Sequence, residues 1–166
     1  MPAQGIGETG RPRALETILL GGLIAGALDG LDAVVYYRAA MGVPPALLFQ
    51  HIASGVLGPQ SFRGGWPTVL LGVGLQFTIA LGAAAVFYAA CFALPALYRT
   101  PAIYGPVFGI CVYVVMHYVV VPMSRVTPRT VPVSTAEFVD QIFSHTVFVG
   151  LPIALAARRS ARRGMK

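Results

Sequence analysis

Five polar residues that lie in otherwise apolar stretches are the candidates for chemistry in this sequence. They are Asp29, Asp32, Gln76, His117 and His145. Carboxylates and imidazoles exchange protons, and together they offer the oxygen and nitrogen ligands that divalent metal ions accept. An ionisable side chain near the centre of a bilayer costs about 2.5 to 3.5 kcal/mol to insert, so such residues face protein or water rather than lipid. The residues therefore predict a polar site between helices.

The composition indicates an integral membrane protein. Of the 166 residues, 56% are hydrophobic and 11% are charged, whereas a soluble domain has about 25% charged residues. The mean hydropathy is +0.72. The net charge of +6 comes almost wholly from arginine and concentrates at the C-terminus. That pattern suits a cytoplasmic membrane face better than nucleic-acid binding.

Four stretches are long and apolar enough to cross a bilayer, which needs about 20 residues. We expect them at residues 15–37, 68–94 and 103–121, and from Ser134 or Thr135 to residue 157. Between the first two, Pro44-Pro45 and Gly58-Pro59 bracket a helix that is too short to span. The sequence thus predicts an all-α integral membrane protein: a four-transmembrane-helix bundle with a short extra interfacial helix between helices 1 and 2.

The domain organisation predicted from these stretches is simple. Residues 1–13 form a flexible tail, residues 14–157 a single four-span membrane domain, and residues 158–166 a basic tail. Four spans place both termini on one side. That side carries eight basic residues, at positions 11, 13, 99, 158, 159, 162, 163 and 166, and the other side carries four, at positions 38, 63, 125 and 129. The excess predicts cytoplasmic termini.

The five candidates fall at similar depth in the predicted spans. At about 1.5 Å per residue, each lies roughly 6 to 12 Å from the outer end of its helix. We therefore expect a polar layer in the outer third of the membrane. Glu137, Gln141 and His145 form a row at a spacing of four, flanked by Asp140, so Glu137 and Asp140 are secondary candidates. His51, on the short helix, is another, although an interfacial position explains it more simply.

Glycines at a spacing of four mark the faces where helices can approach closely. They are Gly22, Gly26 and Gly30 in the first span and Gly105 and Gly109 in the third. Small residues at this spacing let backbones of membrane helices pack together. These faces could serve packing within the chain, or contact with a second copy or another membrane protein.

Two functions from different classes fit the residues. The first is the passage or sensing of a proton or cation at the polar layer. The alternative is a non-transporting structural or accessory subunit, in which the polar residues are interhelical hydrogen bonds and the glycine faces bind a partner. An enzyme is less favoured, because Ser54, Ser124 and Ser144 lack a nucleophile motif. No motif identifies a cofactor or a particular metal, and an organic ligand or haem also stays open.

The second half of the chain resembles the YagU-like family of bacterial inner-membrane proteins. The resemblance rests on GPVFGICVYVVMHYVVVPMSRVTP, which begins at Gly105, and on EFVDQIFSHTVFVG, which begins at Glu137. Members of that family can carry His where this chain has Gln76. The resemblance implies a small multi-span protein of the bacterial inner membrane with no established biochemical activity.

Overall fold

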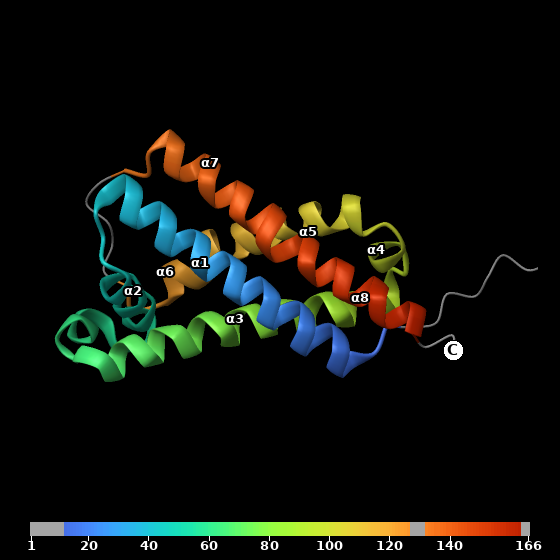
Figure 1. Cartoon of the computed structure of the whole chain (residues 1–166), viewed down its shortest axis with the longest axis horizontal. Coiled ribbons are helices and arrows are strands. Elements are labelled where there is room, and N and C mark those ends of the chain that lie inside the picture. Colours follow the sequence, from blue (N-terminus) through green and yellow to red (C-terminus); the bar gives the residue numbers. More distant parts are fainter. Residues whose placement is uncertain (1–11, 127–131, 164–166) are drawn as a thin grey trace, which may run out of the picture.

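The computed structural model describes residues 12–126 and 132–163, which form a bundle of four long apolar helices (Figure 1). Within these ranges there is no strand, so the predicted all-α, four-span architecture is confirmed. The spans run over Glu16–Met41, Gly65–Ala93, Pro101–Met123 and Thr135–Arg163. Their segments are η1 (Glu16–Gly21) and α1 (Gly22–Met41); α3 (Gly65–Ala93); α5 (Pro101–Val115), η3 (Met116–Val120) and α6 (Val121–Met123); and α7 (Thr135–Ser144), η4 (His145–Gly150) and α8 (Leu151–Arg163).

Several helix ends differ from those predicted. The first span continues to Met41, where Gly42 adopts a left-handed conformation with φ of 68°, a common way to end a helix. The third span passes Pro122 and ends one residue later, at Met123. The fourth continues to Arg163, so most of the predicted basic tail is helical. The predicted N-terminal tail lies almost wholly outside the described residues.

The short extra helix is present as α2 (Pro45–Leu57), followed by the 3-10 helix η2 (Gly58–Arg63). It packs on the start of α3, where the Gln50 side-chain amide donates to the carbonyl of Gly65 (3.3 Å) and to Thr68 Oγ1 (3.2 Å). The backbone of Arg125 donates to the carbonyl of Gly55 at 2.9 Å. Thus α2 covers the end of the bundle opposite the described ends of the chain (Figure 1).

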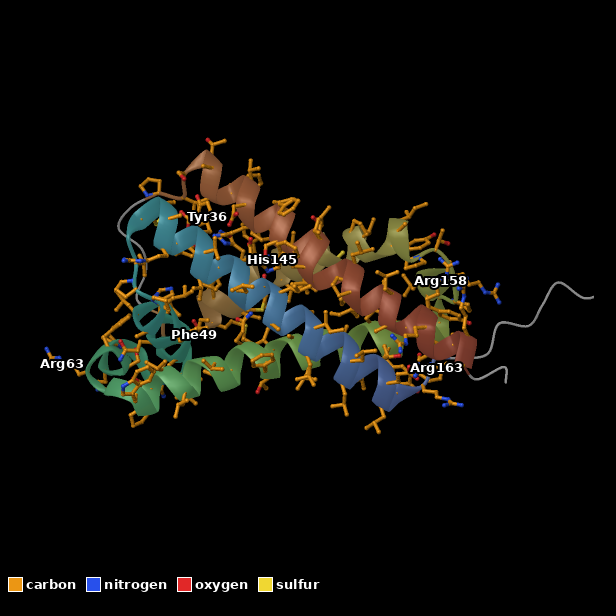
Figure 2. All side chains as sticks on the ribbon, in the orientation of Figure 1. Tyr36, Phe49, Arg63, His145, Arg158 and Arg163 are labelled. Carbon is orange, nitrogen blue, oxygen red and sulfur yellow. The ribbon has the colours of Figure 1, made fainter. Side chains whose placement is uncertain are left out.

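The end of the bundle near the chain termini is joined by polar contacts between the first and fourth spans. Arg163 forms an ion pair with Glu16 at 2.9 Å, and Thr17 shares a buried hydrogen bond with Ser160 at 3.0 Å. Figure 2 shows Arg158 and Arg163 at this end and Arg63 at the other. A tightly packed apolar cluster fills the same half of the bundle, with Phe87, Ile153, Ala154 and Ala157 among its buried members.

Glycines set the spacing between the spans. A Cβ added to Gly22 or Gly26 would come within 3 Å of Leu81 or Phe77 on α3. A Cβ on Gly109 would overlap the carbonyl group of His145, and one on Gly150, which the sequence reasoning missed, would overlap that of Gly105. Gly30 is less tight, at 3.6 Å from Gln76. The predicted glycine faces therefore pack within the chain.

We expect Gly109→Ala to destabilise the protein and Gly74→Ala to leave its stability nearly unchanged. The first places a methyl group on a backbone carbonyl, and overpacking of this kind costs about 1 to 3 kcal/mol. The second adds the same methyl group where no other atom lies within 4 Å. Thermal unfolding of both variants in detergent measures the difference. Equal melting temperatures would show that the third and fourth spans are not in close contact at Gly109.

Candidate functional site

A cavity of about 770 Å³ lies between the spans in the half of the bundle that α2 covers. All five primary candidates line it, and so do His51 and Asp140, while Glu137 does not. Other polar lining residues are Tyr37, Tyr113, Ser124, Gln141 and Ser144. No arginine or lysine of residues 12–126 and 132–163 contributes to its lining. Among the described residues, the cavity therefore combines carboxylates and imidazoles without a permanently charged basic side chain.

Asp29 joins three spans through its carboxylate. Gln76 Nε2 donates to Asp29 Oδ2 at 2.8 Å, and Ser144 Oγ donates to Asp29 Oδ1 at 2.9 Å. Because α1 continues to Met41, Asp29 lies about 18 Å from the end of its helix, deeper than the predicted 12 Å. Both of its oxygens have a donor, so Asp29 is mainly a structural group that positions its neighbours.

Asp32 and Asp140 line the same cavity but, unlike Asp29, have no hydrogen-bond donor among the described residues. No hydrogen bond from a described residue reaches either carboxylate, and Asp140 is within electrostatic range of Asp32, Asp29 and Glu137. Carboxylates that line one cavity without hydrogen-bond donors favour a bound cation or a shared proton. These two groups are therefore the ones available to a ligand.

The two histidines lie on either side of Tyr113. The His117 ring stacks on Tyr113 with centroids 5.5 Å apart, and the His145 ring meets it edge-on, also at 5.5 Å. His145 Nδ1 lies 2.9 Å from the carbonyl oxygen of Gln141. A carbonyl only accepts, so Nδ1 carries the proton, and in the neutral ring Nε2 is left as an acceptor. Figure 2 shows His145 near the middle of the fourth span.

The carboxylate–histidine pairing that the sequence suggested is not found. No ion pair within 4.0 Å joins His117 or His145 to a carboxylate of the described residues, because each ring packs instead on Tyr113. Likewise, no three His, Cys, Asp or Glu residues in the described ranges converge closely enough to hold a metal ion. The cavity thus brings the candidates to one place without forming a compact metal-binding cluster.

Glu137 has a larger structural role than a charge in the first turn of a helix. Its side chain is fully buried, and it accepts from Tyr37 Oη at 2.7 Å and from Gln141 Nε2 at 3.4 Å. Ser134 accepts from the backbone N–H of Glu137, as the predicted helix cap. The sequence analysis did not single out Tyr37. Its position could have been found from the sequence, because Asp29, Ala33 and Tyr37 follow one another at a spacing of four and so share a helix face.

His51 lies on α2 at the rim of the cavity. Its side chain is exposed, and its ring lies 6.4 Å from that of Phe62. This position agrees with the interfacial role suggested by the sequence. It also places an imidazole at the end of the cavity that is farther from the packed half of the bundle.

The cavity narrows toward the packed half of the bundle. There the rings of Phe87 on α3 and Phe108 on α5 meet with centroids 4.9 Å apart. One to two turns away, Ala83 and Ile79 on α3, Val112 on α5 and Met116 on η3 line the cavity instead. Phe87 and Ile153 are fully buried below it. The packed half of the bundle therefore separates the cavity from the end that carries the chain termini.

Comparisons with protein-family models, with curated proteins and with solved structures find no match to this chain.

The hydrogen bond between Asp29 and Ser144 predicts energetic coupling. In a double-mutant cycle of Asp29→Ala and Ser144→Ala, we expect a coupling of about 0.6 to 1.7 kcal/mol, the range for polar contacts between membrane helices. The matched cycle of Asp29→Ala with His145→Ala should be additive within about 0.5 kcal/mol, because no bond joins them. Stability in detergent gives both values. An additive first cycle, or a stronger second one, would contradict the assigned partners of Asp29.

Proposed function

We propose that this protein takes up a proton or a cation from one side of the membrane into the cavity, and senses or passes it there. The observation that supports the proposal is the position of Asp32 and Asp140. Both carboxylates line a cavity in an apolar bundle, and no described residue donates to them or balances their charge. An ionisable side chain inside a membrane protein is by default a candidate functional site.

Binding or sensing is better supported than passage in this conformation. The fully buried side chains of Phe87 and Ile153 separate the cavity from the end that carries the chain termini. The nearest buried polar pair beyond them, Thr17 and Ser160, bond to each other. Passage across the membrane would require a second arrangement in which the spans separate at this apolar cluster.

The charge distribution supports an orientation for the site. Among the described residues, the elements that carry them place six arginines at the terminal end, Arg13, Arg99, Arg158, Arg159, Arg162 and Arg163, and three at the α2 end, Arg38, Arg63 and Arg125. The positive-inside rule then places both termini in the cytoplasm and opens the cavity to the outside. With the YagU-like resemblance, this supports a place in a bacterial inner membrane.

The alternative role as an accessory subunit is less favoured, because it expected the glycine faces to bind a partner. Gly22, Gly26, Gly105 and Gly109 contact other spans of the same chain, so these faces are not available to a separate protein. Asp29 does have the structural hydrogen bonds that this alternative expected, but Asp32 and Asp140 do not.

Infrared difference spectroscopy across pH tests the proposal. We expect a carboxyl band of the purified protein to change with pH, as the proposed uptake of a proton requires. Asp32→Asn or Asp140→Asn should remove or shift the band, because each removes one of the interacting groups. The matched control is Glu16→Gln, which removes a carboxylate at the opposite end. A band that is absent, or that survives both cavity variants, would contradict the proposal.

A further inference from the structure

The size and walls of the cavity indicate what kind of cation it takes. We infer that the ligand is a hydrophobic organic cation that reaches the site from within the membrane. The inference rests on the proposed function, since it specifies the cation that the cavity carboxylates bind.

The volume of the cavity fits an organic molecule rather than a bare ion. Pockets for small organic ligands measure about 300 to 1,000 Å³, and this cavity measures about 770 Å³. A metal ion needs several oxygen or nitrogen ligands around one point. The described residues hold no group of three His, Cys, Asp or Glu that could supply them.

The two sides of the cavity differ in chemistry. The first and fourth spans supply the carboxylates of Asp32 and Asp140. The second and third spans supply mainly apolar side chains, which include Ile79, Ala80, Ala83, Val112, Met116 and Val120. A ligand with an apolar body and a positive charge matches both sides at once. A neutral apolar ligand would leave the two carboxylates desolvated without compensation, which is costly.

The apolar side of the cavity also reaches the surface of the bundle. Ile79 on α3 and Val120 on η3 line the cavity, yet 37% and 39% of their surfaces are exposed. These positions lie between the second and third spans, which meet at Phe87 and Phe108 nearer the packed end. In a membrane this surface faces the hydrocarbon region. A hydrophobic cation dissolved in the bilayer can therefore enter sideways between the two spans.

Binding of two ions with the same shape and opposite charge tests the inference. The probes are radiolabelled tetraphenylphosphonium, a cation, and tetraphenylborate, an anion, measured by equilibrium dialysis against the full chain in detergent. We expect saturable binding of the cation with an affinity at least about tenfold higher than that of the anion. Asp32→Asn and Asp140→Asn should each weaken cation binding, and Glu16→Gln should not. Equal affinities for the two probes would overturn the inference without any variant.

A second pair of variants separates this inference from the proposed function. Ala83→Phe fills the apolar side of the cavity, whereas Val86→Phe adds the same ring to a side chain that is 63% exposed on the same helix. We expect the first to lower tetraphenylphosphonium affinity at least about tenfold, the second to leave it unchanged, and both to retain the infrared titration. A protein that titrates but does not bind tetraphenylphosphonium would overturn the inference and leave the proposed function standing. Loss of both signals in the unmodified chain would overturn both.

Discussion

The carboxylate of Asp29 is the group on which the arrangement of the site depends. The bilayer core offers no water to solvate a polar group, so the protein itself must supply the hydrogen-bond donors. Gln76 and Ser144 supply them from the second and fourth spans. These two bonds set the rotation of three helices relative to one another. Asp32 lies about one turn further along the first span and Asp140 about one turn before Ser144, so both carboxylates line the same cavity.

The cavity exists because the two halves of the bundle pack differently. Toward the chain termini, Gly22 and Gly26 bring the first span against the second, and Phe87 and Ile153 fill the space between spans. Gly105, Gly109 and Gly150 hold the third and fourth spans together along the cavity wall. Beyond Phe108 the third span no longer contacts the second closely, and α2 packs on α3 at the far end. The result is a cavity that is closed on one side and accessible from the other.

The sequence was sufficient to predict the four spans, because length and hydropathy identify them, and the five polar residues that it singled out line one cavity. It was insufficient to predict partners. Each residue turns a helix by about 100°, so one position decides which side chain faces a neighbour. Tyr37 and Ser144, which the sequence did not single out as site residues, are the ones that bond to Glu137 and Asp29. The first and fourth spans also end later than predicted, at Met41 and Arg163. Hydropathy identifies only the apolar part of a helix, and each of these helices continues beyond that part.

The central claim is that the cavity is open to water from the α2 end and closed toward the chain termini. Labelling of single cysteines by a membrane-impermeant maleimide, applied to sealed vesicles on the α2 side, tests it most directly. The background would carry Cys91→Ala and Cys111→Ala to remove the native thiols. The account predicts that Ala33→Cys, in the cavity, reacts, and that Ala157→Cys, in the packed half, does not. Protection of Ala33→Cys, or equal labelling of both positions, would contradict it.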